Sequence, residues 1–273
     1  MTEAVRPVGP DEAAAVEVLS AHKTYPDGTV ALQPVDLSIR EGEFVTLLGP
    51  SGCGKSTLLK MVAGLLEPSD GRLLLWRKPV AKLEEAGRKL AFVFQAPTLM
   101  PWASVATNVR LPLDLAGVPR PEADTRVADA LRLVGLEKFA QALPRALSGG
   151  MQMRVSIARS LVVQPDLLLM DEPFGALDEI TRHKLDAELL SLWADRKLTV
   201  VFVTHSIHEA VFLSTRVVMM AARPGRIVEE FHIDEPYPRK PEFMVSARFA
   251  EIARRLQDSL LRASQTLQEE PLA

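Results

Sequence analysis

The sequence predicts an α/β fold with a largely parallel sheet, and three observations lead to that prediction. The chain has 273 residues, 47% of them hydrophobic, which is enough for a sizeable core. Helix-like spacing lies between short apolar runs, as in Leu185, Leu189 and Leu192 after Asp178, and strands that alternate with helices are typical of parallel sheets. Four runs are apolar at nearly every position, as expected of strands buried on both faces: 44–48, 90–94, 167–170 and 199–203.

The two ends of the chain are expected to lie outside this fold. Residues 1–15 contain Pro7, Gly9 and Pro10 and are predicted to form a flexible leader. Residues 236–273 are predicted to form a short helical tail, because four apolar side chains there are spaced for one face of a helix: Phe249, Ile252, Leu256 and Leu260.

Between the ends, the pattern changes twice. From residue 16 to 40, short apolar runs around the turn Pro26-Asp27-Gly28 predict a β-rich start. In residues 97–160, prolines at positions 97, 101, 112, 119, 121 and 144 punctuate helix-like segments. We therefore expect a mainly helical insertion in an α/β core that is formed by 16–96 and 161–235.

Composition and patterning argue against several classes of protein. The net charge of −3 lacks the basic balance of a nucleic-acid-binding chain, so no nucleic-acid partner is expected. The single cysteine, Cys53, cannot form a disulfide within the chain, which fits a reducing compartment. No stretch reaches the roughly 18–20 apolar residues of a membrane span, and the N-terminus has no apolar signal core.

The strongest local signal is a glycine-rich loop that fits the phosphate-binding P-loop pattern. Its glycines let backbone N–H groups surround phosphate oxygens, and the helix that follows points its positive N-terminus at them. Lys55 would reach the β- and γ-phosphates of a nucleotide, and the Ser56 hydroxyl would hold Mg²⁺. The alternative is a glycine-rich turn beside a solvated lysine, but the apolar strand before the loop and the helix-compatible residues after it favour a nucleotide site. The predicted ATP-binding residues are Gly49, Pro50, Ser51, Gly52, Cys53, Gly54, Lys55, Ser56 and Thr57.

Polar residues follow the three other predicted buried strands, at Gln95, Asp171-Glu172 and His205. The carboxyl ends of parallel strands form one ligand-binding edge, so these groups should converge on the phosphates. Asp171 would complete the Mg²⁺ site, Glu172 would polarise the attacking water, Gln95 would order Mg²⁺ and water, and His205 would contact the γ-phosphate or that water. Taken singly, the acidic pair can also be a helix cap, and Gln95 or His205 a structural side chain.

Taken together with one further motif, these residues resemble the ATP-binding cassette (ABC) ATPases. Residues 147–154, Leu-Ser-Gly-Gly-Met-Gln-Met-Arg, resemble the signature motif, and the order of motifs matches over about 16–235. In that comparison Tyr25 is the adenine-stacking residue, Gln95 lies in the Q-loop, Asp171-Glu172 form the Walker B pair, Asp178 ends the D-loop and His205 is the switch histidine. The resemblance implies a P-loop NTPase (RecA-like) core, an N-terminal antiparallel β subdomain and an inserted helical subdomain with the signature motif.

The signature motif also implies a partner. Ser148 and the two glycines precede a helix, whose free N–H groups suit an anion. In the ABC family this terminus completes the ATP site of a second cassette, which implies a head-to-tail homodimer across two ATP molecules. The contributing residues are Ser148, Gly149, Gly150 and Met151. Two positions depart from the commonest family pattern: Met151 replaces Gln, and Gly175 replaces a frequent D-loop Ser.

Three segments further resemble ATPases of nitrate/sulfonate/taurine-type importers: 99–102, 170–182 and 223–226. That resemblance implies a peripheral ATPase at the cytoplasmic face of the inner membrane, energising uptake of such a solute or of a thiamine-precursor-like one. It also implies permease subunits that dock near Gln95–Trp102 and a periplasmic or lipid-anchored substrate-binding protein. The alternatives are a soluble ABC ATPase that acts on nucleic acid or ribosomes, and an exporter ATPase.

Overall fold

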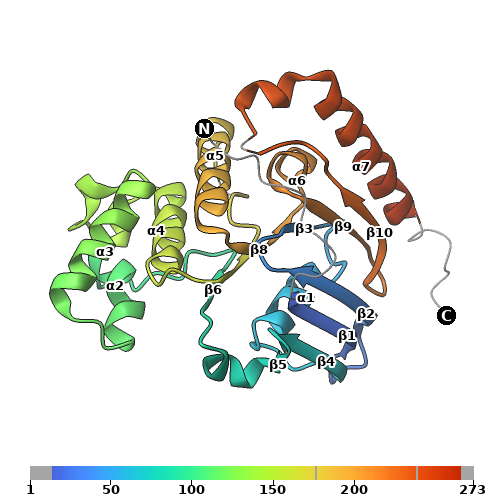
Figure 1. Cartoon of the computed structure of the whole chain (residues 1–273), viewed down its shortest axis with the longest axis horizontal. Helices are drawn as coiled ribbons and strands as arrows, with labels where there is room; N and C mark the ends of the chain where they lie inside the picture. The colour runs from blue at the N-terminus through green and yellow to red at the C-terminus, as the bar shows by residue number, and fades with distance from the viewer. Residues whose placement is uncertain (1–13, 176, 238, 266–273) are drawn as a thin grey trace.

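The computed structural model describes residues 14–175, 177–237 and 239–265, which form two sheets and seven α-helices (Figure 1). The larger sheet has the strand order β10-β9-β3-β8-β7-β6 and is parallel except for β10. Its strands are β3 (Phe44–Leu48), β6 (Leu90–Val93), β7 (Leu167–Asp171), β8 (Thr199–Thr204), β9 (Arg216–Ala221) and β10 (Arg226–His232). The four predicted buried strands are therefore β3, β6, β7 and β8, and the α/β prediction is confirmed.

The smaller sheet is antiparallel, with the order β2-β1-β4-β5. Its strands are β1 (Ala14–Thr24), β2 (Val30–Arg40), β4 (Asp70–Leu75) and β5 (Lys78–Pro79). Because β1 starts at Ala14, the last two residues of the expected leader belong to this strand. The rest of that leader and residues 266–273 of the expected tail lie outside the described residues.

Residues 105–161 are mainly helical and extend to one side of the sheets in Figure 1. They contain α2 (Val105–Leu115), α3 (Arg120–Leu133) and α4 (Gly149–Leu161), and α4 packs both on its helical neighbours and on β6. The remaining helices are α1 (Lys55–Val62), α5 (Glu179–Arg196), α6 (Ile207–Leu213) and α7 (Ala247–Gln265), and short 3₁₀ segments lie at Val80–Ala86, Glu137–Phe139, Pro144–Ala146 and Pro241–Val245.

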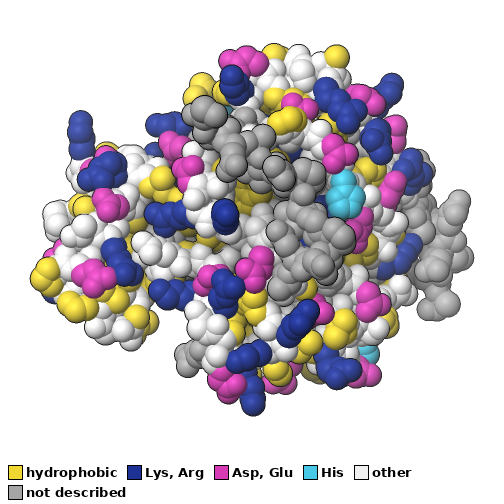
Figure 2. Space-filling model, in the orientation of Figure 1, with side chains coloured by type: hydrophobic (Ala, Val, Ile, Leu, Met, Phe, Trp, Pro, Cys, Tyr) yellow, Lys and Arg dark blue, Asp and Glu magenta, His cyan; other side chains and the backbone are white. Residues whose placement is uncertain are grey.

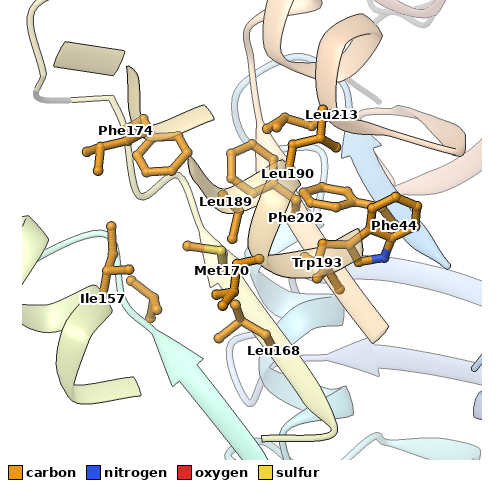
Figure 3. Packing of buried hydrophobic residues seen from close by; sticks show 14 of the residues in the cluster. Phe44, Ile157, Leu168, Met170, Phe174, Leu189, Leu190, Trp193, Phe202 and Leu213 are labelled. Atoms are coloured by element: carbon orange, nitrogen blue, oxygen red, sulfur yellow. The ribbon is translucent and has the colours of Figure 1, made fainter. Parts of the chain in front are cut away.

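The parallel strands are buried on both faces, which explains their unbroken apolar character. On one face Val45 and Leu47 pack in a cluster with α1 and the antiparallel sheet. On the other face Phe44 and Phe202 pack in a cluster with α5 and α6; their ring centroids are 6.0 Å apart, and Trp193 meets Phe44 edge-on at 6.2 Å (Figure 3). This two-sided core fixes the strand ends at which the polar residues lie.

The C-terminal helix α7 packs in the same cluster as Phe44 and Phe202, on that face of the larger sheet. Phe249, Ile252 and Leu256 of α7 are buried, as their spacing predicts. Ahead of α7, the buried guanidinium of Arg239 donates hydrogen bonds to the carbonyls of Val211 and Phe212 at 2.7 and 2.9 Å, at the end of α6. Through Arg239, the C-terminal segment therefore binds the C-terminal end of α6, the helix that follows His205.

The surface mixes the two signs of charge. On the face shown in Figure 2, Lys and Arg side chains alternate with Asp and Glu, and no broad basic area forms among the residues drawn there in colour. Within the described ranges, none of the helices has the length and apolar character needed to span a membrane.

Candidate nucleotide site

The P-loop turns between the end of β3 and the start of α1. Gly54 has φ of +86° and its missing Cβ leaves room for the backbone of β2, since an added Cβ would lie 2.9 Å from the Ala31 carbonyl oxygen. No side chain caps α1 among the described residues, so its first N–H groups remain available for an anion. This is the phosphate cradle that the motif predicts.

The side chain of Lys55 is held inside the P-loop by hydrogen bonds to its backbone. Its Nζ donates hydrogen bonds of 2.8 Å to the carbonyls of Gly49 and Pro50, and its side chain is only 5% exposed. Cys53 is buried beside it, with Sγ 3.6 Å from Nζ, and burial raises the pKa of the thiol. The lysine is thus placed at the loop before a nucleotide enters, with carbonyl partners that phosphate oxygens can replace.

Ser56 and Asp171 join the P-loop to the end of β7. The Ser56 hydroxyl donates a 2.7 Å hydrogen bond to Asp171 Oδ1. Asp171 is 4% exposed, and burial raises the pKa of its carboxyl while the Ser56 hydrogen bond opposes that rise. A hydroxyl and a buried carboxylate at this distance are oxygen ligands of the kind that Mg²⁺ takes together with nucleotide phosphates, so the pair fits the predicted metal site.

Glu172 contacts the polar side chains that follow the two neighbouring strands, β6 and β8. Its Oε2 accepts a 3.4 Å hydrogen bond from Gln95 Nε2 and lies 3.3 Å from His205 Nδ1. The backbone of Glu172 has φ of +46°, a conformation that a non-glycine residue adopts rarely, and its N–H donates to the Val203 carbonyl at 3.0 Å. The structure therefore brings Gln95, Glu172 and His205 together, as the strand topology predicts.

The signature motif and the D-loop meet on this chain. Ser148 is the N-cap of α4, and its Oγ accepts a hydrogen bond of 3.2 Å from the Met151 N–H. A Cβ added to Gly150 would lie 2.8 Å from Leu177 Cδ2, in the D-loop. Asp178 caps α5 by accepting from Thr181 N at 2.9 Å, and this bond lowers the pKa of the Asp178 carboxyl.

Tyr25 lies on the turn before β2, the strand that abuts the P-loop through Ala31. The turn is closed by a 2.9 Å hydrogen bond from the Gly28 N–H to the Tyr25 carbonyl. Tyr25 is 36% exposed, and the centroid of its ring lies 5.9 Å from Lys23 Nζ. An accessible ring in this position remains available for stacking on a base.

Two buried carboxyls and a partly exposed guanidinium lie next to these loops and were not predicted from the sequence. Arg182, Asp186 and Glu209 lie on α5 and α6, and the last two are 1% and 5% exposed. Burial, with the charge of Glu209 added, raises the pKa of Asp186 to about 8, and burial also raises the pKa of Glu209. The available signal was the i, i+4 spacing of Arg182 and Asp186 on the buried side of a helix.

Comparison with known proteins assigns this site to a family. Residues 32–175 match the ABC transporter family. The taurine import ATP-binding protein TauB of Rhizobium johnstonii is 52% identical over 204 residues, which cover 75% of this chain and 77% of that protein. The aliphatic sulfonates import ATP-binding protein SsuB of Bacillus cereus is 39% identical over 242 residues, covering 88% and 93%.

Solved structures agree with the sequence matches. An ATP-binding cassette in a dimeric post-hydrolysis state, bound to ADP and Pi, has a TM-score of 0.74 at 35% identity, covering 81% of this chain and 99% of the other. The cbiO1 protein from Clostridium perfringens, part of the ABC transporter complex cbiONQ, has a TM-score of 0.73 at 29% identity, covering 94% and 100%. The motif resemblance is thereby confirmed, and the chain belongs to the ABC transporter family of ATP-binding proteins, which are ATPases coupled to transport.

Proposed function

We propose that this chain is the ATP-hydrolysing subunit of an importer for a small solute of the sulfonate, taurine or nitrate class. The observation that supports it most is the meeting of two groups at one sheet edge: Lys55, Ser56 and Asp171 on one side, and Glu172 with its two partners on the other. The import direction and the solute class rest on the relatives named for taurine and aliphatic sulfonates. Nitrate and a thiamine-precursor-like solute, both implied by the sequence, are not named among these relatives.

Each residue has a chemical task in this proposal. The loop N–H groups and Lys55 bind the phosphates, Ser56 and Asp171 hold Mg²⁺, and Tyr25 stacks on the base. Bound Mg²⁺ supplies neutralisation of the charge on the β- and γ-phosphates. Glu172 is the general base, because its carboxylate lies at the sheet edge within reach of both Gln95 and His205, which orient it and the attacking water.

The signature residues act in a second copy of the chain. Ser148 and Gly149 are exposed at the start of α4, so this helix terminus is open to a ligand from outside the chain. We propose a head-to-tail homodimer in which residues 148–151 complete the partner's ATP site and Asp178 lies at the interface. The ADP-bound cassette, whose solved structure is dimeric, supports a dimer.

The segment after Gln95 forms a firm platform for permease subunits. The buried Asn108 amide accepts from the Met100 N–H at 2.7 Å and donates to the carbonyls of Ala103 and Ser104 at 3.1 Å. These bonds fix the loop, while Trp102 stays 78% exposed at its tip. A large apolar side chain held out by a rigid loop suits docking to a protein partner.

Arg159 ties this platform to the signature helix. Its guanidinium donates to the carbonyls of Pro97 and Thr98 at 3.1 and 3.0 Å. Movement of the docking segment is therefore transmitted to α4. In the proposed complex, this subunit is peripheral at the cytoplasmic face of the inner membrane, and a substrate-binding protein delivers the solute to the permease.

Turnover by Glu172→Gln tests the proposal. The amide keeps the size of the side chain but removes the base, and loss of a positioned base typically lowers the rate by about 10²–10⁴-fold. We expect this loss in Mg²⁺-ATPase assays, with ATP still bound and an ATP-dependent dimer detected by size-exclusion chromatography with light scattering.

The control for this experiment is Glu137→Gln, an exposed carboxyl in the helical insertion. It should retain wild-type turnover. Wild-type turnover in Glu172→Gln itself would contradict the assignment of the base. Permease-independent activity that depends instead on DNA or ribosomes would favour the soluble alternative.

A further inference from the structure

A partly buried polar connection runs from the D-loop to the loop that carries His205. It starts at Arg182 in the first turn of α5, whose Nη2 donates a 3.0 Å hydrogen bond to the Leu177 carbonyl. Nε of the same guanidinium lies 3.5 Å from Glu209 Oε1 on α6. One side chain therefore contacts both the D-loop and α6, the helix that follows His205.

Glu209 in turn holds both neighbours of His205. Its Oε2 accepts a short hydrogen bond from the Thr204 hydroxyl, and its N–H donates to Ser206 Oγ at 3.3 Å. The Ser206 N–H also donates to Thr204 Oγ1 at 2.9 Å. The backbone on each side of His205 is thus fixed by one carboxylate and its helix, while the imidazole itself stays 66% exposed.

The other end of the connection faces the signature motif. A Cβ added at Gly150 would lie 2.8 Å from Cδ2 of Leu177, the residue whose carbonyl accepts from Arg182. A shift of the D-loop on contact with a second chain would therefore act on the Arg182 guanidinium. Because that guanidinium is the cationic partner of Glu209, the shift would reach the backbone around His205.

The burial of the two carboxyls makes loss of a charge partner in this connection costly. Glu209 has only 6% of its side chain exposed, and Asp186, one turn along α5 from Arg182, adds a second buried carboxyl. Arg182 Nε and Asp186 Oδ1 have no hydrogen-bond partner among the described residues. Removing the Arg182 guanidinium leaves the Glu209 carboxylate without this ion-pair partner in a buried setting, which is costly in an interior of low dielectric.

We propose that Arg182 and Glu209 are positioning residues for ATP hydrolysis, which couple the place of the D-loop to the place of His205. Neither residue touches ATP in this scheme. Their effect is to set His205 against Glu172 when the D-loop is engaged. The inference rests on the proposed function, because it takes His205 and Glu172 as the catalytic pair.

The test uses the full-length chain with Arg182→Gln and Glu209→Gln, and with both together. Glutamine at either position keeps a hydrogen-bonding side chain and removes the charge. We expect each single variant to lower kcat for Mg²⁺-ATP at least about tenfold, with KM and the stoichiometry of fluorescent ATP-analogue binding changed less than twofold. The double variant should be no slower than the slower single variant, because both changes break one connection.

Lys184→Gln is the matched control, since Lys184 is an exposed cation on the same helix, 3.9 Å from Glu188. It should keep wild-type kcat. If Arg182→Gln does not fold, Arg182→Lys takes its place. Its kcat is expected to lie between those of wild type and Glu209→Gln, because lysine keeps the charge but lacks the planar guanidinium.

The outcomes separate the two ideas. Folded Arg182→Gln or Glu209→Gln protein with wild-type kcat overturns the coupling, and so does additive loss in the double variant. Wild-type turnover by Glu172→Gln or His205→Ala overturns the proposed function instead. A purely structural role for the pair would lower the melting temperature and the fraction of protein that binds nucleotide while leaving kcat per bound site unchanged, and that result also counts against the coupling.

Discussion

The Ser56 hydroxyl donates a 2.7 Å hydrogen bond to Asp171 Oδ1, which joins the first turn of α1 to the last residue of β7. The two residues are 115 positions apart. Their contact preforms a pair of oxygen ligands, so the metal site does not depend on a rearrangement of the strands.

Asp171→Asn tests this site. The amide still accepts from Ser56 but removes the negative charge that would face Mg²⁺. We expect the Mg²⁺ concentration for half-maximal ATPase activity to rise at least about tenfold, because Mg²⁺ depends on carboxylate ligands together with phosphate. Binding of ATP in EDTA should change less than twofold, and Asp258→Asn on the exposed side of α7 should behave as wild type in both assays. An unchanged Mg²⁺ titration would contradict the assignment.

Two adjacent glycines distinguish contacts within the chain from contacts across the dimer. An added Cβ at Gly149 meets nothing within 4 Å, whereas at Gly150 it meets Leu177 Cδ2 at 2.8 Å. Gly149→Ala should therefore leave the melting temperature of the isolated chain within about 2 °C of wild type. In the dimer its methyl group would enter the partner's ATP site, and we expect kcat to fall at least about tenfold.

Gly150→Ala should lower both quantities, because Leu177 has to move even in the isolated chain. Differential scanning fluorimetry and steady-state ATPase assays measure the two effects. Wild-type kcat in Gly149→Ala would count against the head-to-tail arrangement.

Trp102 and Leu115 form a matched pair for the docking surface. Both are in or beside the same helical insertion, with 78% and 81% exposure, but only Trp102 lies in the loop fixed by Asn108. Trp102→Ala should reduce recovery of this subunit with the permease several-fold in a pull-down from detergent, while ATPase activity of the free subunit stays at the wild-type level. Leu115→Ala should leave both unchanged, and equal losses for the two variants would argue against a defined docking loop.

The sequence predicted the phosphate loop and the strand ends because both follow from local patterns. A P-loop is continuous in sequence, and Gln95, Glu172 and His205 each follow an apolar run, so parallel topology alone brings them together. Strands β4, β5, β9 and β10 were not predicted individually, because each begins with a charged residue and does not form an apolar run from its first position.

The connection through Arg182 could not be predicted in the same way. Its partner Glu209 is on another helix, and the contact arises only when α5 and α6 pack on one side of the sheet. A charged residue in an amphipathic helix is ordinarily read as exposed, and nothing in the spacing shows which carboxyl a guanidinium will meet. Tertiary packing decides such pairs, whereas the motif decides the phosphate contacts.

Asp186 gives a prediction about pH. Burial and the nearby charge of Glu209 raise the pKa of Asp186 to about 8 from its ordinary 3.8, with Arg182 acting in the opposite direction. Between these two pH values the native chain keeps a proton that the unfolded chain has lost. The free energy of unfolding that this group contributes therefore falls as pH rises from about 4 to about 8, and stays low above that.

Asp186→Asn removes the titrating group and keeps its size. We expect the variant to melt higher than wild type at pH 8, by roughly 5 °C, and the difference to shrink as pH falls to 5. Differential scanning fluorimetry of the nucleotide-free chain in buffers from pH 5 to 8.5 measures this, and Asp195→Asn, at an exposed position of the same helix, should show a difference near zero throughout. A difference between wild type and Asp186→Asn that is the same at every pH would mean that Asp186 does not titrate in this window, since ionisable groups far from Asp186 contribute equally to both proteins.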